Sequence, residues 1–351
     1  MSNSDLRVID LRSDTLSLPT SEMLTAMAGA RLGDDGRDTG GKGEDPTVNR
    51  LEAIAANLLG KEDALFVPSG TMGNMIALMV HAPAGSCIAV DKDAHVYKME
   101  RGNFIEGLHG YRPVFIPARQ GFYDPDVLDK VLSCGHLSLV CIENTHNYAG
   151  GTVLSPEQTE IIADVCVRHE VPLHLDGARV FHAAAALDVN ASDLVRRVDS
   201  VMVCLSKGLC APVGSMLAGT RDFIRNARGK RRLLGGQMRQ AGVLAAAGIV
   251  ALEKMTLRVQ DDNSLACMLA ESLADVGCLD IDTGTVQTNM VRVALKTQLT
   301  AEQFASRLYD EYRVKVGPVS QDMLRMVIYN GIGKADIESA AERIRSFCRA
   351  L

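Results

Sequence analysis

Short apolar runs alternate with segments of helical periodicity between about residue 45 and residue 205. Six runs have the length and aliphatic composition of buried strands: Ala64–Val67, Cys87–Val90, Val114–Ile116, Leu137–Ile142, Val171–Leu175 and Val201–Leu205. Strands that are apolar on both faces and alternate with helices are typical of a mostly parallel sheet with helices on both sides. The chain therefore predicts an α/β fold built around one such sheet.

The pattern changes after an alanine-rich segment, Gly242–Lys254, which predicts a long helix. Beyond it we expect strands and two amphipathic helices, at Val291–Leu295, Lys315–Gly317, Leu324–Ile328, 300–312 and 334–350. A chain of 351 residues is long enough for one large core and one smaller core. We therefore expect residues 1–250 to form an N-terminal segment and a large domain, and residues 251–351 to form a small α+β domain.

Composition and charge narrow the possible partners. Hydrophobic residues make up 47% of the chain and charged residues 23%, as in an ordinary globular protein. The net charge of −6 argues against a nucleic-acid partner, because neutralising phosphates needs a basic surface. No apolar run approaches the roughly 20 residues of a membrane span, and the first residues lack the apolar region of a signal peptide. Nine cysteines without a CxxC pair indicate small buried side chains in a reducing compartment, so we expect a cytoplasmic protein.

Polar side chains follow several of the predicted strands directly. In a parallel sheet the carboxyl ends of the strands meet at one edge, and ligands bind there. The residues expected at this edge are Ser69, His95, His146, Asp176 and Lys207. We therefore predict that the functional site lies at this edge of the sheet.

Asp176 and Lys207 indicate the cofactor. One predicted strand runs into a carboxylate within residues 174–179, and the next runs into an amine within residues 204–209. Pyridoxal 5′-phosphate (PLP) uses both groups, because a lysine forms a Schiff base with its aldehyde and an aspartate keeps its pyridine nitrogen protonated. Either residue alone could equally be a solvated surface group. Together, in this order and with Arg179 close by, they predict a PLP site.

Ser69, Gly70 and Thr71 lie between a predicted strand and a predicted helix. Such a turn presents backbone N–H groups and a hydroxyl group at a helix N-terminus, which is a favourable place for a phosphate. Many strand-to-helix turns contain glycine and threonine without binding a ligand. Beside Asp176 and Lys207, however, this turn is the expected phosphate site.

His95 and His146 are candidate acid–base groups. A histidine can transfer protons near neutral pH, and its ring can stack on a planar cofactor. A loop histidine that only bonds the backbone is the simpler alternative for His95. The expected position of both residues at the same sheet edge as Lys207 favours a functional role for each.

Three other functional motifs are excluded by their residues or spacing. Residues 36–42 resemble a phosphate-binding P-loop, but Gly43 stands where serine or threonine is required and no apolar strand precedes it. His169 and His174 resemble a zinc-protease motif, but they are five residues apart and Pro172 breaks the helix that would align them. No G-x-G-x-x-G follows the first strand, which argues against a nicotinamide dehydrogenase. We expect no metal site.

The motifs, taken in order, resemble those of the threonine aldolases, which are PLP enzymes of fold type I in a wider group with the aromatic amino-acid β-eliminating lyases. The resemblance runs from Ile9 to about Arg325. It rests on residues 9–15, 45–49, 66–74, 143–147, 175–179, 205–209 and 238–240. It implies an aldolase that cleaves L-threonine, L-allo-threonine or a related β-hydroxy-α-amino acid to glycine and an aldehyde.

The resemblance also implies a role for each site residue. Lys207 would be the Schiff-base lysine, Asp176 would pair with the pyridine nitrogen, and His95 would stack on the ring and transfer protons. Gly70 and Thr71 would hold the phosphate, together with Arg239 of a neighbouring subunit. Ser13, Arg179 and Arg325 would bind the α-carboxylate of the substrate. His146 would lie near its β-hydroxyl group. The resemblance further implies a homotetramer, a dimer of dimers with shared active sites.

Two places depart from the threonine aldolase pattern. The loop at residues 33–46 is longer than in relatives and has Lys42 where a tyrosine is expected, and Gln237 replaces the last glycine of the usual three before Met238. We expect Arg37 and Lys42 to lie near the mouth of the active site and to favour a larger or more polar β-substituent. A longer solvent loop without a role is the alternative.

Two other functions stay open. A β-eliminating lyase needs a good leaving group on Cβ and no base for a β-hydroxyl, so His146 favours the aldolase. A non-catalytic PLP-fold binding protein would be free to lose the catalytic groups, and the intact Lys207, Asp176, Arg179 and His95 argue against it.

Overall fold

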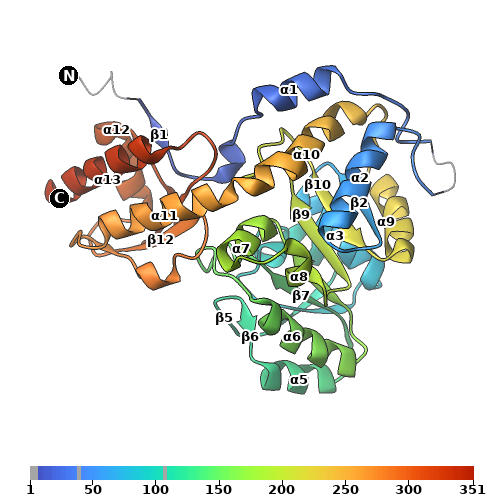
Figure 1. Ribbon diagram of the computed structural model, residues 1–351. Coiled ribbons are helices and arrows are strands. Elements are labelled where there is room, and N and C mark those ends of the chain that lie inside the picture. The colour runs from blue at the N-terminus through green and yellow to red at the C-terminus, as the bar shows by residue number, and fades with distance from the viewer. Residues whose placement is uncertain (1–6, 38–40, 106–108) are drawn as a thin grey trace.

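A seven-stranded sheet forms the centre of the larger part of the molecule (Figure 1). The computed structural model describes residues 7–37, 41–105 and 109–351. Across the sheet the strands lie in the order β2 (Asp63–Val67), β10 (Ser215–Gly219), β9 (Ser200–Cys204), β8 (Leu173–Asp176), β7 (Leu137–Glu143), β3 (Cys87–Val90) and β4 (Arg112–Phe115). Strand β10 runs antiparallel to both of its neighbours, and the other strands all run in one direction. The predicted mostly parallel sheet is confirmed.

Strand β10 is the strand of this sheet that the sequence pattern does not predict. Its residues, Ser-Met-Leu-Ala-Gly, include no β-branched or aromatic side chain, so their composition does not favour a strand. The strand forms because it fills the position between β2 and β9, where all five of its residues are buried. Tertiary packing here outweighs local propensity.

Helices cover both faces of the sheet (Figure 1). In β2, Phe66 belongs to the apolar core on one face, and its neighbours Leu65 and Val67 belong to the core on the other. The first face packs against α2 (Pro46–Leu58), α5 (Pro125–Ser133), α6 (Pro156–Arg168), α7 (Val180–Leu187), α8 (Ala191–Val195) and α10 (Gly242–Lys254). The second face packs against α3 (Gly70–His81), α4 (His95–Lys98) and α9 (Arg221–Leu233).

The C-terminal residues form a second sheet with its own core. Its antiparallel strands lie in the order β11 (Leu279–Asp280), β12 (Met290–Leu295), β15 (Met323–Val327) and β14 (Gly317–Ser320). Helices α11 (Val259–Leu273), α12 (Ala301–Tyr312) and α13 (Lys334–Arg349) pack in this part of the molecule. The predicted strand at 315–317 is in fact divided between β14 and the short strand β13 (Val314–Lys315).

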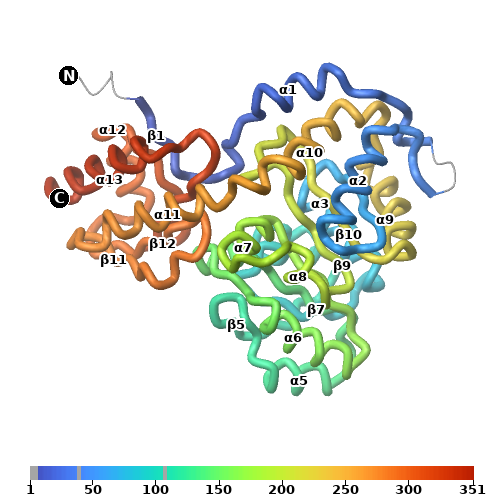
Figure 2. The backbone as a smooth tube through the Cα atoms, viewed as in Figure 1, coloured from blue at the N-terminus to red at the C-terminus, as the bar shows by residue number. Residues whose placement is uncertain are grey.

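The N-terminal segment contacts both cores (Figure 2). Strand β1 (Ile9–Asp10) pairs in parallel with β13, and Ile9 and Leu11 pack into the C-terminal core. The chain then crosses to α1 (Ser21–Ala28), which lies along α10. The division at residue 250 stays a prediction, but β1 packs with the C-terminal core rather than with the large sheet.

The prediction that the cysteines are unpaired is wrong for two of them. Cys278 and Cys348 form a disulfide that ties the segment before β11 to α13. Four of the other cysteines are buried as predicted, and Cys134 is exposed. A hairpin of β5 (Ala118–Arg119) and β6 (Phe122–Tyr123) completes the strands. Among the described residues, no helix has both the length and the apolar character that crossing a bilayer requires.

Candidate active site

Residues from the carboxyl ends of four parallel strands surround one cavity of about 320 Å³. Ser69 follows β2, His95 follows β3, Asp176 ends β8 and Lys207 follows β9. Because these strands point the same way, their ends meet at one edge of the sheet. The structure thereby brings together six of the predicted site residues, namely Ser69, Gly70, Thr71, His95, Asp176 and Lys207.

The wall formed by residues 69–71 is the N-terminus of α3. Ser69 caps this helix, since its side chain accepts a hydrogen bond from the backbone N–H of Met72 at 3.2 Å. The backbone N–H groups of Gly70 and Thr71 have no hydrogen-bond partner among the described residues. A Cβ on Gly70 would lie only 3.0 Å from the sulfur of Cys204, so a glycine allows this close packing. The cavity therefore has free N–H donors at a helix N-terminus, as an anion requires.

Asp176 is buried and held from two sides. Its Oδ1 accepts the backbone N–H of Ala178 at 3.1 Å, and its Oδ2 accepts the side-chain amide of Asn74 at 2.9 Å. Asn74 lies on α3 and is itself fully buried. The carboxylate is thus fixed at the end of β8, where it lines the cavity together with Lys207.

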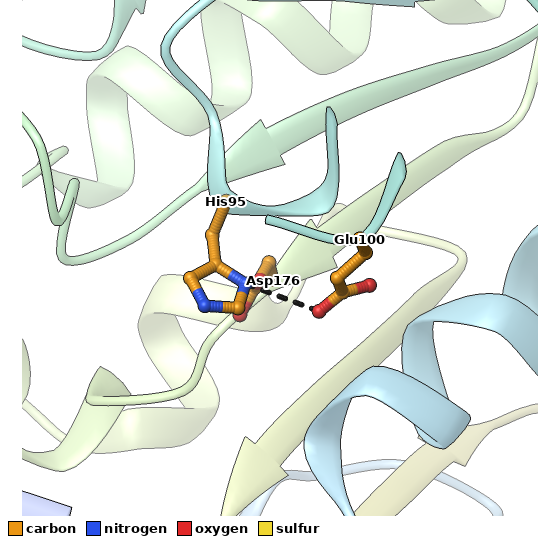
Figure 3. Close-up of side chains that lie close together, drawn as sticks. All are labelled: His95, Glu100 and Asp176. Atoms are coloured by element: carbon orange, nitrogen blue, oxygen red, sulfur yellow. Dashed lines mark hydrogen bonds and ion pairs between the residues drawn. The ribbon is translucent and has the colours of Figure 1, made fainter. Parts of the chain in front are cut away.

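His95 lies beside the same carboxylate and contacts a second one (Figure 3). Its Nδ1 lies 3.1 Å from Oε1 of Glu100, and its backbone N–H donates to Oε2 of Glu143 at 2.7 Å. Burial alone would lower the pKa of the His95 imidazole, but the bond to Glu100 and the negative charge of Asp176 outweigh it, so this pKa is raised. Burial and the nearby Asp176 also raise the pKa of Glu100.

The buried Arg179 and the half-buried Arg325 lie next to each other, and among the described residues only Arg179 has a carboxylate partner. Arg179 makes a bidentate ion pair with Asp14, with Nε–Oδ2 and Nη2–Oδ1 distances of 2.6 and 2.7 Å. Arg325, on β15, donates to Oδ1 of Asn147 at 2.6 Å, and its Nε is buried without a partner. Burial and the positive charge of Arg179 lower the pKa of Arg325. Among the described residues, no carboxylate pairs with Arg325, so it is poised to bind an external one.

Ser13 precedes the residue that binds Arg179. It caps the short helix Asp14–Leu16, and its side chain accepts from the backbone N–H of Thr15 at 3.2 Å. Ser13 is the sequence neighbour of Asp14, which binds Arg179, and its role at a substrate carboxylate stays a prediction. The described contacts of its side chain are local.

His146 lies apart from the cavity that Lys207 lines. It is buried against a second cavity of about 720 Å³, between the hairpin β5–β6 and the C-terminal sheet. Its Nε2 lies 2.9 Å from Oδ2 of Asp91, and its Nδ1 accepts the backbone N–H of Ala149 at 3.1 Å. Both ring nitrogens of His146 are therefore hydrogen-bonded within the chain, and Nε2 carries the proton.

Arg239 is also outside the cavity of its own chain. Its side chain is 72% exposed and pairs with Asp34 at 3.1 Å. The carbonyl oxygen of Arg239 accepts the backbone N–H of Asp35 at 3.0 Å, which ties the residue to the loop at 33–46. This exposed position leaves the guanidinium accessible to another molecule.

Within its own chain, Lys42 lies away from the cavity that Lys207 lines, and its place near the mouth of a site shared between subunits stays a prediction. Its amine pairs with Asp63 at 3.1 Å, and Asp63 begins β2, at the opposite end of that strand from Ser69. The inserted loop and Gln237, the two places that depart from the threonine aldolase pattern, are in contact. The side-chain amide of Gln237 donates to the carbonyl oxygen of Gly36 at 3.1 Å. Residues 38–40 of the inserted segment lie outside the described residues, and Arg37 is exposed.

Sequence reasoning missed four side chains that hold the predicted ones. Asp14, Asn74 and Asn147 lie inside motifs that carried the resemblance, so their place in those motifs was a usable signal. Glu100 lies five residues after His95 on the chain, and no pattern marks it. Its contact with His95 depends on the turn that follows α4.

Comparisons with known proteins agree with this geometry. The family model described as β-eliminating lyase matches residues 10–296. Low-specificity L-threonine aldolase 1 of Arabidopsis thaliana is 40% identical over 95% of this chain and 94% of its own length. The low specificity L-threonine aldolase of Escherichia coli K12 is 36% identical over 97% and 99%. A solved structure of Leishmania major threonine aldolase shares the fold, with a TM-score of 0.79, 19% identity and coverage of 97% and 99%. The chain therefore belongs to the threonine aldolase group of the β-eliminating lyase family.

Proposed function

We propose that this lyase is a PLP-dependent aldolase that cleaves L-threonine, L-allo-threonine or a related β-hydroxy-α-amino acid to glycine and an aldehyde. One observation carries the proposal: the amine of Lys207 and the carboxylate of Asp176 line the same cavity, whose wall is a helix N-terminus. The curated relatives named above are low-specificity threonine aldolases, and they match this chain over nearly its whole length.

The residues that line the cavity suit PLP by their chemistry. The unpartnered N–H groups of Gly70 and Thr71, beside the Ser69 cap, would hold the phosphate. Asp176 has remaining lone pairs for a protonated pyridine nitrogen, and Lys207 would bind the aldehyde covalently. When bound, the cofactor supplies an electron sink for cleavage of the Cα–Cβ bond.

The arginine pair would orient the amino acid. Arg325 has a buried donor without a partner, so a substrate α-carboxylate would satisfy it and neutralise its charge. Arg179, fixed by Asp14, and Ser13 would complete this subsite. Gripping the carboxylate fixes rotation about the bonds of Cα, which is how the bond to be cleaved can be aligned.

His95 is the better placed histidine for proton transfer. Its Nδ1 is bound to Glu100, and its Nε2 has no partner among the described residues, whereas both nitrogens of His146 are engaged. We therefore assign removal of the β-hydroxyl proton to Nε2 of His95. A well-placed base of this kind contributes about 10²–10⁴-fold to a rate. His146 would act near the β-hydroxyl only through a change of its present bonds.

The assembly and location belong to the same proposal. Arg239 is exposed and lies outside its own chain's cavity, which fits a role at the phosphate of a neighbouring subunit in a homotetramer. A cytoplasmic location follows only from the sequence and stays a prediction. The expected partner is a small amino-acid substrate rather than a nucleic acid or a membrane.

The experiment is to load the purified protein with PLP and supply L-threonine, L-allo-threonine, phenylserine and β-hydroxyaspartate separately. We expect equimolar glycine and aldehyde from at least one of them, and borohydride reduction should fix the cofactor to Lys207. Lys207→Ala should abolish both results, and Asp176→Ala should keep covalent attachment but lose turnover. Pyruvate and ammonia formed from serine derivatives with good leaving groups, without aldehyde from any hydroxy amino acid, would identify a β-eliminating lyase instead.

A further inference from the structure

Glu100 belongs to a largely buried group of hydrogen-bonded side chains, and it lines the cavity together with His95 and Asp176. The side-chain amide of Asn74 donates to Oε1 of Glu100 at 3.1 Å and to Oδ2 of Asp176 at 2.9 Å. Nδ1 of His95 contacts the same oxygen of Glu100. One polar atom of each of His95, Glu100 and Asp176 lies within 4.8 Å of the other two (Figure 3). The two carboxylates are therefore linked through the amide of Asn74, and His95 contacts one of them.

The surrounding bonds fix the orientation of Asn74. Its Oδ1 lies 3.1 Å from Nε2 of His174, whose Nδ1 lies 2.8 Å from the hydroxyl of Ser200. An amide oxygen can only accept, so Nε2 of His174 carries the proton and its Nδ1 accepts from Ser200. Burial also lowers the pKa of His174 to about 3, which keeps that ring neutral. The two carboxylates agree with this assignment, because their oxygens accept and the NH₂ group of Asn74 is the part of the amide that can donate to them.

This orientation of Asn74 determines which ring nitrogen of His95 carries the proton. Oε1 of Glu100 already accepts from Asn74, and a carboxylate oxygen accepts a second bond from Nδ1–H of His95. The neutral imidazole therefore carries its proton on Nδ1, which leaves the lone pair of Nε2 available. Glu100, Asp176 and Glu143 raise the pKa of His95, and the amine of Lys207 is the cation that lines the same cavity.

The hydrogen bonds to Oε1 compensate the burial of Glu100 only in part. Glu100 is 4% exposed, and its Oε2 is buried without a partner. A buried carboxylate beside another carboxylate costs free energy unless a cation or a donor compensates it. His95 is the ionisable donor that it contacts.

We propose that Glu100 is a positioning residue for His95: it fixes the proton on Nδ1, directs Nε2 to the reacting amino acid and strengthens that nitrogen as a base. The inference rests on the proposed function, in which His95 takes the β-hydroxyl proton. Asn74 supports the arrangement by holding Glu100 and the cofactor-facing Asp176 in fixed positions. The substrate proton then passes to Nε2 of His95 as the Cα–Cβ bond breaks, and Glu100 stabilises the resulting imidazolium.

The test compares Glu100→Gln with the wild type as PLP-loaded protein. Glutamine keeps the size and an acceptor for Nδ1–H but removes the charge. The control is Asp93→Asn, which removes an exposed carboxylate of the same loop, one that pairs with Lys98 at 2.8 Å. The protein contains eight histidines, so the NMR signal of His95 is identified by its absence in His95→Gln.

We expect the NMR titration midpoint of His95 to move to lower pH in Glu100→Gln and to stay in place in Asp93→Asn. The acidic limb of kcat/KM against pH should move in the same direction, and kcat at neutral pH should fall about tenfold, a part of the contribution of a general base. PLP affinity is measured in parallel and all variants are compared at saturating PLP, because Glu100 lines the same cavity as Lys207. If Glu100→Gln does not fold, Glu100→Asp, which withdraws the carboxylate by one methylene, should move the midpoint in the same direction.

An unchanged His95 midpoint in the glutamate variant would overturn the proposal, as would equal losses of activity in Glu100→Gln and Asp93→Asn. The titration needs no turnover. If the wild type cleaves no hydroxy amino acid, the proposed function fails, and the link between Glu100 and His95 is still decided by the NMR measurement.

Discussion

Asp14 and Arg179 form a buried ion pair that joins the N-terminal segment to the residues that follow β8. Both oxygens of Asp14 are used, at 2.6 and 2.7 Å from the guanidinium. Burial would raise the pKa of Asp14, but the charge of Arg179 and its hydrogen bonds hold this pKa far below the ordinary value. The pair neutralises Arg179 within the chain. Arg325, which lies beside it, has no carboxylate partner among the described residues, and under the proposed function a substrate carboxylate would neutralise it.

We expect Arg325→Met to raise KM for L-threonine at least tenfold, because a charged hydrogen bond contributes about 1.5–3 kcal/mol. The free energy of unfolding should stay the same or rise, since the variant removes a half-buried charge that has no carboxylate partner among the described residues. Steady-state kinetics and urea unfolding measure the two quantities. Arg292→Met is the matched control, because Arg292 is exposed and is the cross-strand neighbour of Arg325 on β12. An unchanged KM in Arg325→Met would exclude Arg325 from the carboxylate subsite.

Asp14→Asn should lower the free energy of unfolding by about 3–5 kcal/mol, because it leaves Arg179 buried without a counter-charge. The folded-state pKa of Asp14 lies below its unfolded value of about 3.8, so its contribution is present above that pH and is lost as the pH falls further. Denaturant unfolding at pH 7 and at acidic pH measures both effects. Asp93→Asn, at an exposed pair, should cost no more than about 1 kcal/mol. Equal costs for the two variants would contradict this account.

Two histidines with poorly solvated rings, the buried His174 and the half-buried His81, predict a second loss of stability in acid. Burial lowers the pKa of His81 to about 4 and that of His174 to about 3, from an ordinary value of 6.5. The unfolded chain therefore binds more protons than the folded one below that value, so stability should fall as the pH drops from about 6.5 toward 4. Urea midpoints across this range measure the loss. His81→Gln, which can keep a hydrogen bond to Ser200, should flatten the dependence, and an unchanged slope would argue against the His81 assignment.

Sequence patterns predicted most of the sheet because buried parallel strands are marked by continuous apolar runs. β3 was predicted with its observed bounds, and α10 was as well. β10 was missed, because its position is set by the neighbours on either side. The Cys278–Cys348 pair was missed because the two cysteines are far apart in the sequence. Contacts of this kind depend on the whole fold rather than on local spacing.

In the candidate site, too, the sequence predicted the local features and missed the contacts that depend on the whole fold. Residues directly after strands were predicted to converge, and Ser69, Asp176 and Lys207 do line one cavity. The partners that tune them come from other segments: Asp14 from the N-terminus and Asn74 from α3. For His146 the sequence predicted the correct sheet edge but could not predict the bonds to Asp91 and Ala149 that engage its ring.

Arg239 provides a test of shared active sites. Arg239→Ala and Lys207→Ala should each be nearly inactive, the first through a weakened phosphate site and the second through loss of the amine. If Arg239 serves a neighbouring subunit, mixing the two variants under conditions of subunit exchange should create some sites with both residues intact. Recovery of activity well above either variant alone is expected. No recovery, together with an active monomer at working concentration, would exclude the shared site.

The inserted loop is expected to act through Arg239 rather than on the substrate. A Cβ on Gly36 would lie 2.7 Å from Nη1 of Arg239 and 2.9 Å from Oδ1 of Asp34, so Gly36→Ala should displace the guanidinium from its present position. If Arg239 binds the phosphate of a neighbouring subunit, this variant should weaken PLP binding about tenfold, the effect of losing one charged hydrogen bond.

The relative kcat/KM values for L-threonine and phenylserine should stay unchanged in Gly36→Ala, because Lys42 pairs with Asp63 at the far end of β2. Arg37→Ala, which alters an exposed residue of the same loop, is the matched control and should retain normal PLP binding. Equilibrium titration with PLP and competition between the two substrates measure these quantities. A changed substrate preference with normal PLP affinity would show instead that the loop contacts the substrate, because only that contact could alter selectivity while the phosphate site remained intact.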